Sequence, residues 1–366
     1  MLRRQNVNPN ILNEPGGAAG SGRGATGHTT LKEEDLVTAL RKTLGIAAAS
    51  LVLLAATACG GGGSDTASSG GGGNDQITLG FAQVGAESGW RTANTKSIQD
   101  SAKDAGINLK FSDAQQKQEN QIKAIRSYIQ QKVDVIAFSP VVESGWDTVL
   151  KEAKDAGIPV VLTDRSVDSQ DTSLYVTFLG SDFIAEGKKA GEWTVKNFAN
   201  ASGEVKIAQL EGTTGSAPAI DRAEGFADVI KSDPKLKIVA SQTGDFTRAG
   251  GKQVTEALLK SNPDITMIYA HNDDMALGAI EAIEAAGKVP GKDITIVSVD
   301  AVHDGMQALS DGKINFIVEC SPLLGPQLMD VVKKVKAGES VEKRIVTEET
   351  TFTPEQAKEA LPSRQY

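Results

Sequence analysis

The sequence predicts an α/β protein with two doubly wound parallel-sheet lobes. Three observations lead to this prediction. From residue 77 onward, short apolar runs alternate with amphipathic segments at the spacing of β-α-β units. The alternation runs once through residues 77–180 and starts again after residue 180. The chain of 366 residues is also longer than a single hydrophobic core usually organises.

The first half carries five apolar runs of strand length. Strands are expected at residues 77–83, 109–114, 135–140, 160–164 and 175–180. Helices are expected from about residue 89, at residues 118–131 and at residues 144–158. Within residues 118–131, isoleucines recur at helical spacing and form one apolar face, which indicates a helix packed against a sheet.

The second half repeats the pattern. Strands are expected at residues 205–212, 238–244, 265–272 and 294–300, and helices at residues 186–198, 219–234, 251–263 and 274–287. Glycine follows several helices just before the next strand, at Gly106, Gly157 and Gly287, which is typical of a left-handed C-cap. Two such sheets in tandem would face their strand ends across a cleft suited to a small ligand.

Charge and cysteine content exclude some partners. Lys plus Arg number 38 against 47 Asp plus Glu, which gives a formal charge of −9. Nucleic-acid binding needs clustered positive charge, so no nucleic-acid partner is expected. The two cysteines, Cys59 and Cys320, lie in such different contexts that a disulfide is not expected. Cys320 ends an apolar run and is expected to be a small buried side chain rather than a reactive thiol.

The amino-terminal tract predicts export. Residues 1–58 are interpreted as an extension and a signal, because the apolar run 43–58 follows two basic residues and is short for a bilayer span. The run resembles a bacterial lipoprotein signal in which Cys59 is lipidated. An ordinary secretory signal cleaved after Ala58 is the alternative. Residues 59–76 then form a Gly/Ser linker.

Polar and aromatic side chains stand where the predicted strands end. They are Trp90, Arg91, Asp164, Arg165, Asn272 and Asp300. In an open α/β sheet these positions gather at the carboxyl ends of the strands, where ligands bind. Carboxylates accept hydrogen bonds, guanidinium groups donate them and an amide does both. The set therefore suits a neutral, hydroxyl-rich ligand better than a phosphate or a metal.

Motifs for other chemistries are missing from the sequence. The turn after residue 83 lacks the G-x-G-x-x-G pattern, and neither a Walker A nor a G-x-S-x-G element occurs. The three histidines are scattered, and Asp273 and Asp274 are expected to begin a helix as N-terminal carboxylates. We therefore expect no cofactor, no metal and no enzymatic activity.

Several segments together point to a family. They are ESGWR (87–91), DAQQKQENQIKAIRS (113–127), VLTDRS (161–166), AIDRAEGF (219–226), GDFTR (244–248), YAHNDDMALGAI (269–280) and VSVD (297–300). From Ile77 to the carboxyl terminus, the chain resembles the type I periplasmic sugar-binding proteins of ABC importers, in the ribose/galactose group. Within that group it most resembles the galactofuranose-binding members.

The resemblance implies a set of ligand-binding residues. Asp164 and Arg165 would bind vicinal hydroxyls from the first lobe. Arg222, Asn272 and Asp300 would do so from the second lobe. Arg222 taken alone could equally belong to a solvated charged face, because two acidic residues flank it on the expected helix.

Four further positions match the family. Trp90 and Phe246 fall where its members place rings against the C–H face of a sugar. Arg91 and Glu319 belong to the galactofuranose-like pattern rather than to the ribose one.

The resemblance also implies an architecture and a role. One lobe would comprise residues 77–180 plus 321–346 and the other residues 181–320 plus 347–366, joined by a hinge. A monomer anchored at the outer face of the cell membrane would deliver one monosaccharide to a permease. Galactofuranose is the preferred ligand, with arabinose, ribose or galactopyranose as alternatives. A chemosensory receptor stays open, whereas a repressor would need an amino-terminal DNA-binding domain in place of the signal and linker.

Overall fold

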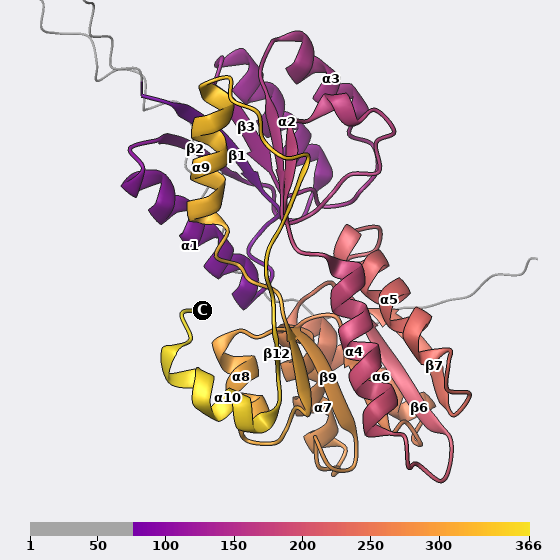
Figure 1. The fold of residues 1–366 in the computed structure, drawn as a ribbon. Helices are drawn as coiled ribbons and strands as arrows, with labels where there is room; N and C mark the ends of the chain where they lie inside the picture. Colours follow the sequence, from indigo (N-terminus) through magenta and orange to yellow (C-terminus); the bar gives the residue numbers. More distant parts are fainter. Residues whose placement is uncertain (1–75) are drawn as a thin grey trace, which may run out of the picture. The chain divides into compact units, whose positions relative to one another are not determined.

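The structure is a computed structural model that describes residues 76–366. The predicted signal, Cys59 and nearly all of the predicted linker lie outside the described residues. The described part contains two six-stranded sheets (Figure 1), which confirms the expected fold class. Across residues 76–366, every helix is too short or too polar to cross a membrane.

The first sheet has the strand order β11-β5-β4-β3-β1-β2. Its strands are β1 (Thr78–Gln83), β2 (Asn108–Asp113), β3 (Val135–Phe138), β4 (Val160–Thr163), β5 (Thr177–Gly180) and β11 (Arg344–Val346). Its helices are α1 (Gly89–Asp104), α2 (Gln118–Gln130), α3 (Asp147–Asp155) and α9 (Gly325–Lys336), with a 3₁₀ turn at Thr172–Leu174. All of its strands pair in parallel. We call this sheet with its helices the first lobe.

The second sheet has the order β12-β10-β9-β8-β6-β7. Its strands are β6 (Val205–Glu211), β7 (Leu236–Thr243), β8 (Met267–Ala270), β9 (Thr295–Asp300), β10 (Phe316–Glu319) and β12 (Thr351–Phe352). Its helices are α4 (Phe183–Asn197), α5 (Ala217–Ile230), α6 (Arg248–Ser261), α7 (Asp273–Ala285), α8 (His303–Ser310) and α10 (Pro354–Ala360), with a 3₁₀ turn at Leu361–Ser363. Only β12 within it is antiparallel to its neighbour. This sheet and its helices form the second lobe.

Three connections link the lobes. They leave β5 for α4, β10 for α9 and β11 for β12. The second of them returns the chain to the first lobe, where α9 packs beside α1 (Figure 1) and buries Leu328 and Val332 with Leu79 of β1. Each sheet is thus covered by apolar side chains on both faces, as near-continuous apolar strands require.

Local signals explain most helix ends. The glycines expected as C-caps have positive φ: 69° at Gly106, 72° at Gly157 and 72° at Gly287. Asp273 and Asp274 lie in the first turn of α7, as expected. Helix α4 begins three residues before its predicted start because the Asp182 side chain accepts a hydrogen bond from the backbone N–H of Ala185.

Candidate functional site

Side chains from both lobes meet in one pocket. It is lined by Glu87, Ser88, Trp90, Arg91, Asp164, Arg165, Phe183, Pro218, Arg222, Phe246, Asn272, Asp300 and Cys320. Eight of the nine residues predicted to bind a ligand are in this set, and Glu319 is outside it. The open volume, including the mouth, is about 290 Å³. Little of this space is enclosed, because the lining side chains of the two lobes lie close together.

The topology explains why these residues converge. In each sheet the strand order reverses beside the first strand, between β1 and β3 and between β6 and β8. Neighbouring connections leave the sheet toward opposite faces at such a switch point, which opens a crevice at the carboxyl ends of the strands. Asp164 follows β4, Asn272 follows β8 and Asp300 ends β9, so strand termination places each of them at the crevice.

Asp164 is held by two donors of the first lobe. Arg91 Nη2 donates to Asp164 Oδ2 at 2.7 Å, and Ser139 Oγ donates to the same oxygen at 2.9 Å. Arg91 also donates through Nε to Glu87 at 3.1 Å. The guanidinium of Arg91 is therefore largely used by the protein, while Asp164 Oδ1 has no donor among residues 76–366. Asp164 can accept from a ligand hydroxyl, and Arg91 orients it.

The guanidinium of Arg165 is buried, but the surrounding protein offers it few hydrogen-bond acceptors. Its Nη1 donates to the carbonyl of Val141 at 3.1 Å, but its carboxylate neighbours Asp164 and Glu87 lie 3.7 and 3.8 Å away. Its Nε has no hydrogen-bond partner within the described part of the chain. Burial, followed by repulsion from Arg91, lowers the pKa of Arg165 to about 10. A hydroxyl oxygen in the pocket would supply the acceptor that this guanidinium lacks.

The second lobe contributes Arg222 and Asp300. Arg222 is 3% exposed, so the solvated charged face considered for it from the sequence is wrong. Its Nε donates to Glu186 at 2.6 Å and its Nη1 to the carbonyl of His271 at 2.6 Å. The Asp300 carboxylate lies 3.9 Å from Arg222 Nη2. Burial raises the pKa of Asp300 well above its usual range, although Arg222 opposes the shift.

Three aromatic residues, Trp90, Phe183 and Phe246, line the pocket. The guanidinium carbon of Arg165 lies over the Phe246 ring, 5.3 Å from the ring centroid. An arginine of the first lobe therefore covers a ring of the second lobe. Trp90 donates from Nε1 to the carbonyl of Cys320 at 2.7 Å, which ties α1 to the connection after β10. A flat ring with a negative face suits the C–H face of a sugar.

Asn272 has a structural as well as a pocket-lining position. Its Oδ1 accepts the backbone N–H of Met275 at 3.0 Å and caps α7. Its Nδ2 donates to the carbonyl of Phe246 at 3.1 Å. The second N–H of this amide is what remains for a ligand, so Asn272 is a donor here rather than the donor and acceptor that the sequence suggested.

Glu319 is not where the sequence placed it. Its Oε1 accepts from Arg364 Nη1 at 2.8 Å and its Oε2 from the backbone N–H of Thr350 at 3.1 Å. The next residue, Cys320, lines the pocket instead. Successive side chains of a strand point to opposite faces, so Glu319 at the end of β10 points away from the side that its neighbour faces.

Five pocket residues were missed from the sequence. They are Glu87, Ser88, Phe183, Pro218 and Cys320. Glu87 had a signal, since it belongs to the same turn as Trp90 and Arg91. Its Oε2 is buried without a donor in residues 76–366, and it faces the ligand space with Asp164. Phe183 is the first residue of α4 and Pro218 the second residue of α5, and no local pattern marked them.

Known proteins resemble this chain over most of its described length. Residues 79–340 match the periplasmic binding protein domain. The galactofuranose-binding protein YtfQ of Escherichia coli K12 is 49% identical over 292 residues, which cover 79% of this chain and 91% of that protein.

Two solved structures are similar as well. A Mycobacterium smegmatis protein in complex with β-D-fucofuranose is 68% identical, with a TM-score of 0.78 over 79% of this chain and 95% of that one. The binding component of an arabinose ABC transporter from Shewanella sp. ANA-3, bound to α- and β-L-arabinofuranose, is 50% identical, with a TM-score of 0.76 over 79% of this chain and 96% of the other.

Proposed function

Because this chain belongs to the periplasmic binding protein family, we propose that it binds one monosaccharide in the pocket and delivers it to the permease of an ABC importer. One observation carries the proposal. Polar groups from both lobes face the same space with hydrogen-bonding capacity left over, including Asp164 Oδ1, Asp300 and Arg165 Nε. A ligand that both donates and accepts satisfies all three, and sugar hydroxyls do both.

Selectivity would follow from burial. A hydrogen bond to a charged group contributes roughly 1.5–3 kcal/mol net, and a buried partner left unmatched costs a similar amount. A monosaccharide has about 12 heavy atoms, so micromolar binding needs near 0.7 kcal/mol per atom, below the ceiling for small ligands. A sugar with one inverted hydroxyl would leave a buried carboxylate or guanidinium unpaired and lose affinity.

We propose galactofuranose as the preferred ligand. The support is that the names of similar proteins mention galactofuranose, fucofuranose and arabinofuranose, which share a five-membered ring. Arabinose, ribose and galactopyranose are the alternatives.

Calorimetry with a sugar panel tests the ring form. We expect heat of binding with D-galactose, D-fucose and L-arabinose, whose solutions contain furanose forms, and none with methyl β-D-galactopyranoside, which is locked in the six-membered ring. Carbon NMR of the protein with C1-labelled D-galactose should show furanose anomeric signals in the bound fraction.

Two results would contradict the proposal. Binding of the locked pyranoside as tightly as D-galactose would refute the furanose preference. Absence of heat with every sugar of the panel, from protein that melts cooperatively, would refute sugar binding itself.

The location of the protein is proposed from the amino-terminal tract. Lipidation of Cys59 and the Gly/Ser linker 59–76 would tether the two lobes to the outer face of the cell membrane as a monomer. A tethered receptor stays near its permease, which raises the local concentration of loaded receptor.

A further inference from the structure

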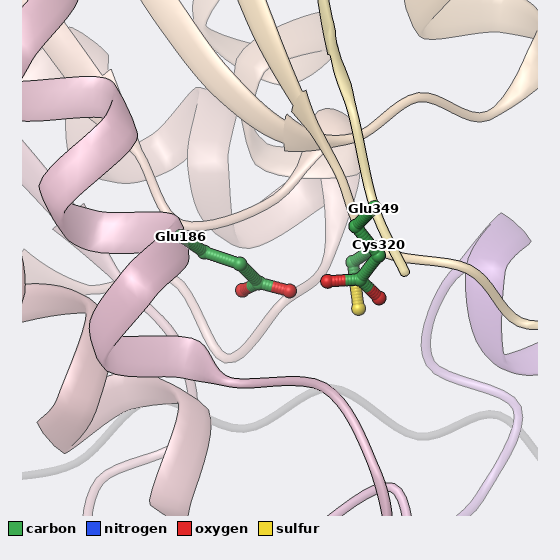
Figure 2. A group of neighbouring side chains, drawn as sticks. All are labelled: Glu186, Cys320 and Glu349. Carbon is green, nitrogen blue, oxygen red and sulfur yellow. The ribbon is translucent and has the colours of Figure 1, made fainter. Parts of the chain in front are cut away.

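A small cluster of polar side chains lies beside the pocket, where the lobes are connected. It consists of Glu186 on α4, Glu349 between β11 and β12, and Cys320 after β10 (Figure 2). One oxygen or sulfur atom from each lies within 4.8 Å of the others. We call these three residues the hinge cluster. Glu186 and Cys320 are buried and Glu349 is half-buried.

One oxygen of Glu349 bonds to all three connections. Ser181 Oγ, between β5 and α4, donates to Glu349 Oε1 at 2.5 Å. The backbone N–H of Ser321, between β10 and α9, donates at 3.0 Å, and Thr347 Oγ1, between β11 and β12, also donates at 3.0 Å. Glu349 is therefore a shared acceptor for the three segments about which the lobes can move.

Only one of the two carboxyl oxygens of Glu186 has a hydrogen-bond donor in the described residues. Its Oε2 accepts from Arg222 Nε at 2.6 Å. Its Oε1 is buried with no partner in the part of the chain that the structure describes. Figure 2 shows the Glu186 carboxyl pointing toward Glu349 and Cys320. Two ionised carboxylates in this position would repel each other, and a buried acceptor without a donor costs about 1–3 kcal/mol.

A proton on Glu186 removes both penalties. We propose that Glu186 is a protonated positioning residue, whose Oε1–H donates to Glu349 while its Oε2 holds Arg222 toward the sugar. The proposal rests on the proposed function, since Arg222 is one of the residues that would bind the ligand. Glu186 then couples the arginine of the pocket to the carboxylate that joins the connections.

The surroundings support a neutral Glu186. Burial raises the pKa of Glu186 to about 8, with Arg222 opposing the shift and Glu349 adding to it. The other titratable or charged groups near the cluster are Lys189 on α4, Arg222 on α5, Tyr269 on β8, Asp300 on β9 and Cys320 after β10. Burial also raises the pKa values of Tyr269 and Cys320, so both stay neutral while Glu186 titrates. Burial raises the pKa of Asp300 as well, so Asp300 is a second carboxyl that can hold a proton.

A metal ion fits the hinge cluster less well than a proton. The metal-binding form of cysteine is the thiolate, and burial raises the pKa of the Cys320 thiol well above its usual range. Glu349 Oε1 already accepts from three donors, and Arg222 already supplies a positive charge to Glu186.

The proposal predicts how affinity depends on pH. In the closed arrangement Glu186 keeps its proton up to about pH 8. Separation of the lobes admits water to the cluster and lowers the cost of ionisation, so the open form loses the proton at lower pH. Sugar binding is then accompanied by proton uptake. As the pH rises, the affinity for sugar falls by up to about tenfold per pH unit, and the fall ends once the pH exceeds the pKa of Glu186 in the closed form.

Calorimetry with D-galactose and L-arabinose, between about pH 6 and about pH 9, tests this dependence. In buffers of different ionisation enthalpy, the wild type should take up protons on binding, and its affinity should fall by up to about tenfold between pH 7 and pH 9. Glu186→Gln keeps a neutral donor toward Glu349, so its affinity should fall less over this range than that of the wild type and should exceed the wild-type value at pH 9. Glu186→Ala should bind weakly at every pH.

Glu192→Gln is the matched control, because Glu192 is exposed on the same helix. It should keep the wild-type pH profile. Infrared spectroscopy of the sugar-bound protein should show the carbonyl band of a protonated carboxyl at neutral pH, and Glu186→Gln should remove it.

Different results would contradict the proton on Glu186 and the proposed sugar binding. Wild-type binding that does not change with pH, without proton uptake, would overturn the proton on Glu186 while leaving sugar binding intact. A wild-type pH profile in Glu186→Gln would overturn it too. Loss of affinity in chelator that Zn²⁺ restores would assign the hinge cluster to a metal. Absence of binding in the wild type at all pH values would contradict the proposed function.

Discussion

Three pocket residues have backbone conformations that L-residues seldom adopt. The φ angle is 62° at Asp164, 60° at Phe246 and 121° at Asp300. Such conformations cost of order 1–3 kcal/mol each and persist where surrounding contacts hold them. At Phe246 the contact is a glycine: a Cβ on Gly212 would lie 1.8 Å from the ring. In these conformations the side chains of Asp164, Phe246 and Asp300 line the pocket.

Asp164→Ala should weaken sugar binding at least about tenfold, which corresponds to about 1.4 kcal/mol. The change removes a buried acceptor and leaves Arg91 without its partner at 2.7 Å. Calorimetry with D-galactose measures the loss, and a melting curve confirms that the variant is folded. Asp168→Ala is the control, because Asp168 is exposed four residues further along the chain. Equal affinity in Asp164→Ala and wild type would remove Asp164 from the binding site.

At the scale of elements, glycines set the distance between α4 and α5. A Cβ on Gly187 would lie 2.4 Å from the carbonyl oxygen of Arg222, and a Cβ on Gly225 would lie 2.3 Å from that of Ile184. The two helices therefore approach with little between their backbones. This approach allows Glu186 of one helix to reach Arg222 of the other at 2.6 Å.

Gly225→Ala should destabilise the protein by about 1–3 kcal/mol, because the added methyl group forces two backbones apart. It should also weaken sugar binding, since the Glu186–Arg222 contact depends on the same helix spacing. Thermal or denaturant unfolding measures the first effect and calorimetry the second. Gly203→Ala is a matched control, because its Cβ would meet no atom within 4 Å. A Gly225→Ala variant as stable as Gly203→Ala would show that the helices can separate at no cost.

At the scale of the described molecule, the lobes touch through hydrogen bonds outside the pocket. The backbone N–H of Gly89 donates to Asp274 Oδ2 at 2.8 Å, and that of Glu143 donates to the carbonyl of Gly215 at 2.9 Å. Groups that would contact one sugar come from both lobes, so they act together only when the lobes are closed. A ligand that binds the closed form better shifts the population toward it.

Anchoring is the other property of the whole molecule. Cys59→Ala should release the protein from membranes and leave its affinity for D-galactose unchanged, because the cysteine precedes a linker and belongs to neither lobe. Fractionation of cells expressing each form, followed by calorimetry on the released protein, measures both properties. Retention of Cys59→Ala in the membrane fraction would indicate an uncleaved apolar helix in place of a lipid anchor.

Local sequence was enough for the fold class and for six of the thirteen pocket residues, and the family resemblance added Arg222 and Phe246. Apolar runs have the length and spacing of buried strands, and residues directly after a parallel strand must lie at its carboxyl end, so Asp164, Asn272 and Asp300 were found without coordinates. The short strands β11 and β12 were not predicted. With three and two residues, they carry too little apolar pattern to stand out.

Tertiary structure decided what depends on contacts between distant segments. Cys320 lines the pocket, whereas Glu319, which the resemblance placed in the binding site, pairs with Arg364. Glu186 and Glu349 are neighbours in the structure although they are 163 positions apart in the sequence. A local sequence pattern cannot predict such a pair. Sequence determines which groups reach the ends of strands, because that follows from chain direction. Packing decides which of those groups lose their water together. It therefore also decides which of them change their charge.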